Sequence, residues 1–197
     1  MGPSRRGKAH MREPSFTSAA RVGAPNGLSN FIVAARRVLE DLSSMTQEAA
    51  MPNTVRLHRV LRAPPERVYR AFLDADAMVK WLPPNGFTGK VHHLDARVDG
   101  SYRMSFTNFA TGESHVFGGT YTELVPHERI RYTDRFDDPA LPGEIAVTIT
   151  LKPVACGTEL QILQEGLPEA IPVEMCYLGW QQSLVLLGEL VEAEPSA

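Results

Sequence analysis

Six short segments with the character of β-strands follow one another through the second half of the chain, and they constrain its fold more than any other feature. Glycine, proline, aspartate and asparagine separate them, and these residues favour turns. The segments are Phe87–Arg97, Ser101–Phe109, Ser114–Leu124, Arg129–Phe136, Glu144–Pro153 and Thr158–Gln164. Because the connections between them are short, we expect neighbouring segments to pair as antiparallel hairpins and to form a meander.

Helices and one more strand are expected on either side of this meander. Residues Thr54–Leu61 alternate apolar and polar side chains, which predicts a half-buried strand. Two short helices should follow it, from the Pro64–Pro65 pair to Pro83–Pro84, since proline is tolerated in a first helical turn. A long amphipathic helix should run from Pro172 to about Glu192. Its apolar face is wide, so it must be largely covered, most simply by one face of the sheet.

The composition is that of a single globular domain with an extension. The chain has 197 residues, of which 43% are hydrophobic and 22% charged, and it contains no apolar run long enough for a membrane span. The two cysteines, Cys156 and Cys176, are too few for a disulfide framework, which favours a reducing, cytoplasmic location. The net charge is −3, and residues 51–197 hold the acidic excess, so nucleic acid is not an expected partner.

The first part of the chain differs in character from the rest. Residues 1–52 are rich in glycine, proline, serine and arginine, and we expect a disordered or weakly helical leader there, with a short amphipathic helix over Ser29–Leu42. A targeting segment and an extended start upstream of the natural one are both open interpretations. The folded domain is expected to span residues 53–194.

Residues two apart on a strand share a face, and this alternation predicts which side chains face the long helix. One face carries most of the aromatic side chains, whereas Arg103, Ser105 and Thr107 belong to a polar outer face. The candidate pocket residues are Trp81, Tyr102, Met104, Phe106, His115, Phe117, Tyr121, Tyr132, Phe136, Ile149, Ile162, Gln164, Met175, Leu178 and Trp180. Rings with a few polar groups are typical of an apolar ligand pocket, and His115 would be a buried polar group within it. The alternative is that the same rings simply fill the core.

The sequence contains no recognisable catalytic constellation. There is no Gly-x-Ser-x-Gly elbow and no Cys/His signature, so an enzyme is not the favoured interpretation. We expect no cofactor and no metal, because His92 and His93 are adjacent on a strand and should point to opposite faces. Cys176 is expected to be a buried structural thiol rather than a nucleophile. The Gly118–Gly119 pair should mark a bulge or a sharp bend in its strand.

Acid–base chemistry within the pocket stays open as an alternative. Its candidate groups are His115, Tyr102, Tyr121, Tyr132 and Glu165. Glu165 stands at the end of the last strand, where a solvated loop carboxylate is the expected interpretation.

Several short motifs occur in an order that resembles a known superfamily. They are Tyr69–Phe72 before Met78–Leu82, then Gly100–Met104, then Phe117–Tyr121, and finally Gly179–Leu184 on the long helix. This series resembles the START-like (SRPBCC) superfamily of polyketide cyclases and Bet v 1-like proteins. Within it, the branch named for the activator of the Hsp90 ATPase homologue 1 fits best, over residues 53 to about 192.

The resemblance implies an α+β helix-grip fold. In this fold a seven-stranded curved antiparallel sheet wraps around a long C-terminal helix, two short helices follow the first strand, and a cavity lies between sheet and helix. The function it favours is binding of a small hydrophobic or aromatic ligand.

The resemblance also leaves other functions open. One alternative is an Hsp90-associated module of the stress response, although the leader is too poor in core-forming residues to replace the N-terminal domain of the eukaryotic activators. Another is a cyclase or hydrolase acting on a hydrophobic substrate. A homodimer is a further open expectation, because an exposed sheet edge invites pairing.

Overall fold

The computed structural model describes residues 53–193, so the predicted leader and the helix expected over Ser29–Leu42 lie outside the described residues. The helices and strands follow one another in the predicted order. They are β1 (Thr54–Leu61), α2 (Pro65–Ala71), α3 (Ala75–Trp81), β2 (Phe87–Leu94), β3 (Ser101–Asn108), β4 (Ser114–Val125), β5 (Arg129–Phe136), β6 (Ile145–Val154), β7 (Gly157–Glu165) and α4 (Val173–Glu192).

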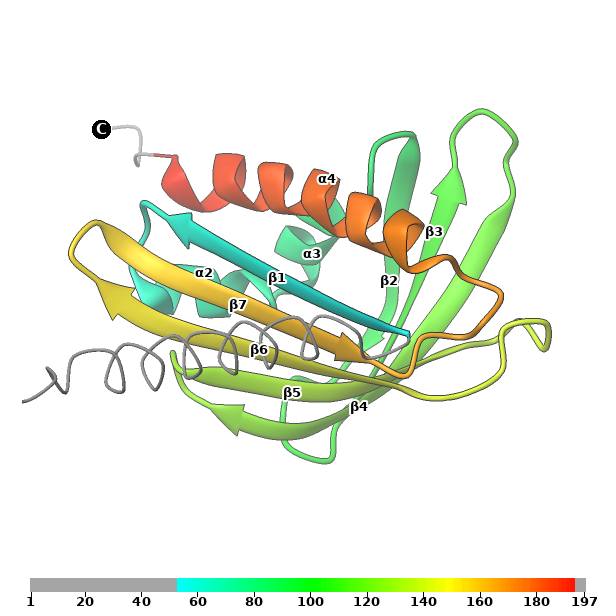
Figure 1. Ribbon diagram of the computed structural model, residues 1–197, viewed down its shortest axis with the longest axis horizontal. Helices are drawn as coiled ribbons and strands as arrows, with labels where there is room; N and C mark the ends of the chain where they lie inside the picture. Colours follow the sequence, from blue (N-terminus) through cyan, green and yellow to red (C-terminus); the bar gives the residue numbers. More distant parts are fainter. Residues whose placement is uncertain (1–52, 194–197) are drawn as a thin grey trace, which may run out of the picture. The chain divides into compact units, whose positions relative to one another are not determined.

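The seven strands form one antiparallel sheet in the order β1-β7-β6-β5-β4-β3-β2. The predicted meander is confirmed, and β1 closes it by pairing along its whole length with β7. The sheet is curved, and α4 crosses its concave side (Figure 1). This is the helix-grip arrangement expected of the sequence.

The two short helices begin as their sequences predict. Pro65 occupies the first turn of α2, where its missing N–H costs no hydrogen bond. The carboxylate of Asp74 caps α3 by accepting a hydrogen bond of 3.0 Å from the backbone N–H of Ala77. The β2 strand ends at Leu94 rather than at the expected Arg97, because the backbone turns between Asp95 and Gly100.

The α4 helix contacts β1, α3 and α2 far more than it contacts the central strands. The Ser183 hydroxyl donates to the carbonyl oxygen of Leu82 over 2.7 Å, which ties α4 to the end of α3. The Arg67 guanidinium donates to the carbonyl oxygen of Val191 over 3.0 Å and so satisfies part of the last turn of α4.

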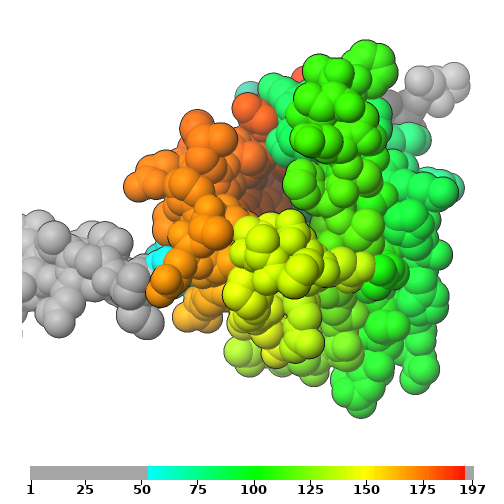
Figure 2. Space-filling view, turned by 90° about the vertical axis from the view of Figure 1, so that its right-hand side faces the viewer, coloured from blue at the N-terminus to red at the C-terminus, as the bar shows by residue number. Residues whose placement is uncertain are grey.

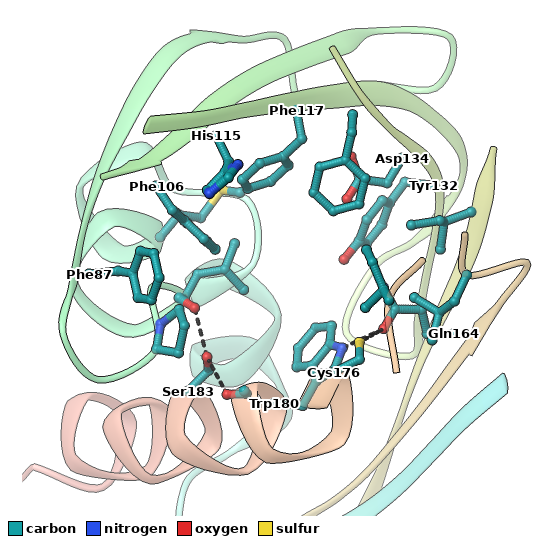
Figure 3. Close-up of a pocket in the computed structure, with 18 of the residues that line it drawn as sticks. Phe87, Phe106, His115, Phe117, Tyr132, Asp134, Gln164, Cys176, Trp180 and Ser183 are labelled. Carbon is teal, nitrogen blue, oxygen red and sulfur yellow. Dashed lines mark hydrogen bonds between the residues drawn. The ribbon is translucent and has the colours of Figure 1, made fainter. Parts of the chain in front are cut away.

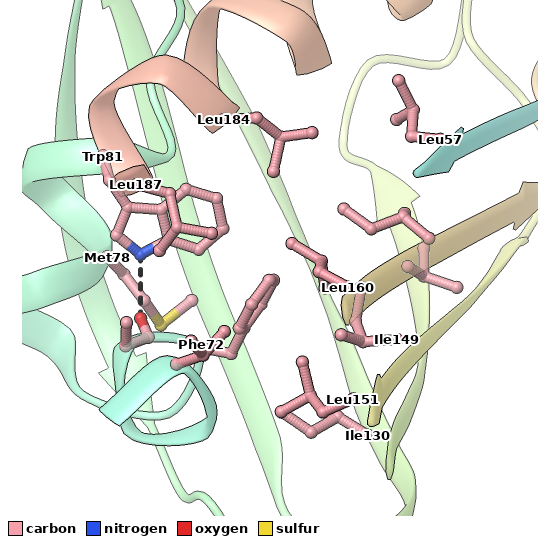
Figure 4. Packing of buried hydrophobic residues seen from close by; sticks show 14 of the residues in the cluster. Leu57, Phe72, Met78, Trp81, Ile130, Ile149, Leu151, Leu160, Leu184 and Leu187 are labelled. Atoms are coloured by element: carbon pink, nitrogen blue, oxygen red, sulfur yellow. Dashed lines mark hydrogen bonds between the residues drawn. The ribbon is translucent and has the colours of Figure 1, made fainter. Parts of the chain in front are cut away.

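One end of the interior is packed solid (Figure 4). Trp81 is completely buried there, donates its indole N–H to the carbonyl oxygen of Ala71 over 2.8 Å, and meets the ring of Phe72 edge to face. Leu184 and Leu187 reach into this cluster from α4. This end therefore supplies the hydrophobic burial that holds the helices on the sheet.

Two expectations about exposure were wrong. Ser105 was assigned to the outer polar surface, but it is buried and hydrogen-bonds to His92 over 2.9 Å. The α4 helix was expected to be largely covered, but Tyr177, Leu178 and Val185 are between 39% and 51% exposed. Sequence periodicity treats all apolar residues on a wide helix face alike, whereas a concave sheet covers only part of that face.

Candidate functional site

A pocket of about 400 Å³ occupies the other end of the interior, between the N-terminal half of α4 and strands β3–β5. Figure 2 shows the corresponding hollow, framed by the orange start of α4, the green strands and the yellow segment that joins β5 to β6. Its lining is mostly aromatic and aliphatic, and it includes residues from α3, from six strands (β2–β7) and from the segments before β2, after β5 and before α4. The sheet and the helix therefore diverge at this end and converge at the packed end.

Most of the candidate pocket residues do line this space. They are Trp81, Tyr102, Phe106, His115, Phe117, Tyr121, Tyr132, Phe136, Gln164, Met175 and Trp180. Met104, Ile149 and Ile162 instead belong to the solid core, each no more than 2% exposed. Leu178 does not line the pocket and is 51% exposed. Strand parity identified the inner face but not which part of that face is packed and which part is hollow.

His115 lies in an exposed position on β4, so the expectation of a buried imidazole among rings was wrong. It still borders the pocket, near Phe106 and Phe117 (Figure 3). Since Tyr121 is six residues further along the same strand, about 20 Å away, His115 is not placed to donate to it. Its position makes it part of the rim of the pocket.

Gln164 provides the polar contacts where β7 faces α4. Its side-chain oxygen accepts hydrogen bonds from the indole N–H of Trp180 over 2.7 Å and from the thiol of Cys176 over 3.1 Å (Figure 3). Burial raises the pKa of the Cys176 thiol to about 11, so it is a protonated hydrogen-bond donor at neutral pH. This agrees with the expected structural thiol.

The α4 residues that face the pocket follow helical spacing, but they are small. Cys176, Gly179 and Ser183 line it together with Trp180. A Cβ atom added to Gly179 would meet no heavy atom within 4 Å, so this glycine leaves space open on the pocket side of the helix. The periodicity of large apolar residues, which predicts the helix, gives no signal for this stripe of small residues.

Asp134 is an acidic lining residue that was not among the candidates predicted from the sequence. It stands between Tyr132 and Phe136 on β5, shares their inward parity, and projects toward the cavity with Tyr132 (Figure 3). Parity alone could have identified it, but an acidic residue at an inward position was not considered. Burial raises its pKa from 3.8 to about 7, although hydrogen bonds from the Tyr102 hydroxyl and the Arg135 backbone N–H oppose the shift.

Tyr102 and Tyr132 lie near this carboxyl, and Tyr121 packs against both of their rings. The ring centroid of Tyr102 lies 5.6 Å from that of Tyr121 and 5.6 Å from that of Tyr132. Burial raises the pKa of all three hydroxyls, and the charge of Asp134 raises those of Tyr102 and Tyr132 further. All three are therefore phenols at neutral pH, able to donate a hydrogen bond to a ligand or to the carboxylate.

The Gly118–Gly119 pair lets the neighbouring strands on both sides approach β4 closely, β3 at Gly118 and β5 at Gly119. A Cβ on Gly119 would clash with the carbonyl oxygen of Thr133, and one on Gly118 with that of Tyr102. The shift in the β4–β5 register, by contrast, lies further along, between Tyr121 and Glu123. The glycines therefore allow the backbones to pack closely beside Asp134. The bulge in this strand lies between Tyr121 and Glu123 instead.

Within residues 53–193, no group of three or more His, Cys, Asp or Glu side chains is arranged to hold a metal ion. None of the helices described combines the length and the apolar character needed to cross a membrane.

A family model described as Activator of Hsp90 ATPase homolog 1-like protein matches residues 62–192. The chain belongs to this family. Its curved seven-stranded sheet and C-terminal helix are those of the START-like (SRPBCC) superfamily, of which the Hsp90 ATPase activator homologue 1-like family is a branch.

Several solved structures share this fold. A crystal structure of a Chromobacterium violaceum protein is 67% identical, with a TM-score of 0.72, and the match covers 73% of this chain and all of that one. Structures from Nitrosomonas europaea (22% identity, TM-score 0.60, covering 70% of this chain and 93% of that one) and Rhodobacter sphaeroides (21%, 0.62, covering 71% and 92%) share the fold. The search of curated proteins returned no match.

Proposed function

We propose that this member of the Hsp90 ATPase activator homologue 1-like family binds a small, largely apolar ligand between its sheet and α4. The observation that carries the proposal is the pocket of about 400 Å³, which lies within the size range of small-molecule sites. Its walls combine rings with a few polar groups, as such sites do. Burial of an apolar ligand surface against these rings provides the driving force for binding.

The packing of the rings supports the interpretation that they form the wall of a ligand pocket and not an incompletely packed core. Phe106, Phe117 and Phe136 stack edge to face in a row, with centroids 4.8 and 6.2 Å apart. Each ring is held by its neighbour and by the strand pairing beneath it. A wall that is fixed in this way loses little conformational freedom when a ligand enters.

The small residues of α4 support the same function. A leucine at position 179 would improve helix propensity and would fill the cavity, yet the chain has glycine there. The open space at Gly179 therefore costs stability, as expected of a binding site and not of a core position.

The test is a Gly179→Leu variant titrated with the neutral fluorescent probe N-phenyl-1-naphthylamine. We expect the wild type to bind the probe with a rise in fluorescence and the variant to bind it at least about tenfold more weakly, because the leucine occupies the probe's volume. Val185→Leu, on the exposed face of the same helix, is the matched control and should bind like the wild type.

Two results would contradict the proposal. One is equal probe binding by Gly179→Leu and the wild type, which would place the probe outside the pocket. The other is the absence of any rise in probe fluorescence with the wild type. If that chain instead stimulated ATP turnover by the cognate Hsp90, the chaperone-associated alternative would be favoured.

A further inference from the structure

The carboxyl of Asp134 has no cationic partner in the pocket. No lysine or arginine belongs to the lining formed by residues 72–183, and the guanidinium of the adjacent Arg135 pairs with Glu144 on the exposed side of the sheet. The histidine of the lining, His115, lies at the exposed rim. A carboxylate removed from water without a positive partner is unfavourable, and the raised pKa of Asp134 expresses that cost.

Apart from His115, the titratable side chains that line the pocket with Asp134 are tyrosines and a cysteine. The titratable side chains of the lining are Tyr102 on β3, Tyr121 and His115 on β4, Tyr132 on β5 and Cys176 on α4. The tyrosines and the cysteine are neutral when protonated and negative when not. Ring faces carry negative electrostatic potential, which favours a positive ligand group. An anionic group would find hydrogen-bond donors but, apart from His115 at the rim, no side chain that can carry a positive charge.

We propose that the pocket selects ligands that carry an organic ammonium group on an apolar body, with the ammonium placed against Asp134 and the tyrosine rings. This inference rests on the proposed function and specifies the class of ligand. The ammonium forms an ion pair with the carboxylate in a poorly hydrated site and lies against ring faces, where cation–π attraction adds to it. The apolar body then lies along Phe117 and Phe136, the next inward rings of β4 and β5.

The test compares two ligands of one shape, 2-naphthylmethylammonium and 2-naphthylmethanol, by isothermal titration calorimetry. At about pH 8 we expect the wild type to bind the ammonium at least about tenfold more tightly than the alcohol. At about pH 5.5 the preference should shrink, because Asp134 takes up a proton while the ammonium keeps its charge. The affinity for the alcohol should change little.

An Asp134→Asn variant isolates the carboxylate, because the amide keeps the size of the side chain and can still accept from the backbone N–H of Arg135. The variant should lose the preference for the ammonium and bind the alcohol within about twofold of the wild type. The matched control is Asp137→Asn, an exposed acid just after β5 that pairs with Arg103. It should keep the preference.

Each outcome has a distinct meaning. Equal binding of the two ligands by the wild type, or a preference that survives in Asp134→Asn, would overturn the inference and leave the apolar pocket intact. Tighter binding of 2-naphthoate than of the ammonium would also overturn it. If the wild type bound none of these ligands, the proposed function itself would fail and this inference with it.

Discussion

The side-chain oxygen of Gln164 on β7 accepts a hydrogen bond of 2.7 Å from the indole N–H of Trp180 on α4. The same oxygen also accepts from Cys176, one turn earlier on the helix. These contacts join strand and helix at the point where the interior opens into the pocket. They fix the orientation of the indole, which then forms one wall of the cavity (Figure 3).

We therefore expect Gln164→Leu to destabilise the protein by about 1–3 kcal/mol, since it leaves the indole N–H without its acceptor. Intrinsic fluorescence should also change, because Trp180 loses a fixed environment while Trp81 stays buried. Urea denaturation and emission spectra measure the two effects. Gln161→Leu, an exposed position on the same strand, is the control. Equal stability of both variants would show that this hydrogen bond does not hold the helix.

A methyl group at Gly119 should be tolerated far less well than one at Gly179. The Cβ would collide with the backbone carbonyl of Thr133, which cannot move without disturbing the β4–β5 pairing. We expect Gly119→Ala to cost about 3 kcal/mol or more in the free energy of unfolding. The same change at Gly179 meets open space within a helix and should gain up to about 1 kcal/mol. Thermal unfolding of the two variants checks the difference, and similar melting temperatures would refute it.

Stability should depend on pH through Asp134. Its pKa is raised from 3.8 to about 7 on folding, so the folded protein binds this proton more tightly than the unfolded chain. The stability that this group contributes is fully present below about pH 3.8 and is lost as the pH rises to about 7. The Asn side chain of Asp134→Asn cannot ionise, so the variant does not lose this stability. Its free energy of unfolding relative to that of the wild type should therefore rise by roughly 1–4 kcal/mol between about pH 5 and pH 8.

Urea denaturation at a series of pH values measures this gain. The exposed Asp137→Asn variant is the control and should run parallel to the wild type. If the Asp134→Asn curve also ran parallel to it, the carboxyl would have to be solvated in the folded state.

The two cysteines should differ in reactivity. Cys156 is exposed in the turn between β6 and β7, whereas Cys176 is partly buried, donates to Gln164 and has a pKa raised to about 11. Alkylation by iodoacetamide at about pH 8 should modify Cys156 at least about tenfold faster, because the thiolate is the reactive form. Peptide mass spectrometry resolves the two sites. Equal rates in the folded protein would contradict the buried position of Cys176, and equal rates in urea are expected.

Much of the fold could be predicted because its signals are local. Alternation, turn residues and proline positions identified every described strand and helix, with ends that differ by a few residues, as at Leu94. Strand parity also assigned most of the pocket wall, from Tyr102 to Phe136. These patterns report which way a side chain points relative to the sheet.

The division of the interior into packed and hollow parts could not be predicted in this way. Met104 and Phe106 share a face, yet Met104 is completely buried and Phe106 borders the cavity. What separates them is the angle between α4 and the sheet, which depends on contacts such as that of Ser183 with Leu82, 101 residues apart in the chain. Asp134 was missed for another reason: its signal was local, but an acid at an inward position conflicts with a search for apolar residues.

Along α4, the residues that line the pocket, from Met175 to Ser183, are largely different from those buried in the packed end, which are Leu184, Leu187 and Val191. Substitutions at the pocket-facing positions of α4 can then accumulate with little effect on the packed end that keeps the chain folded. A scaffold built in this way can change its preferred small molecule over evolutionary time, or in a directed-evolution experiment, while its melting behaviour stays nearly constant.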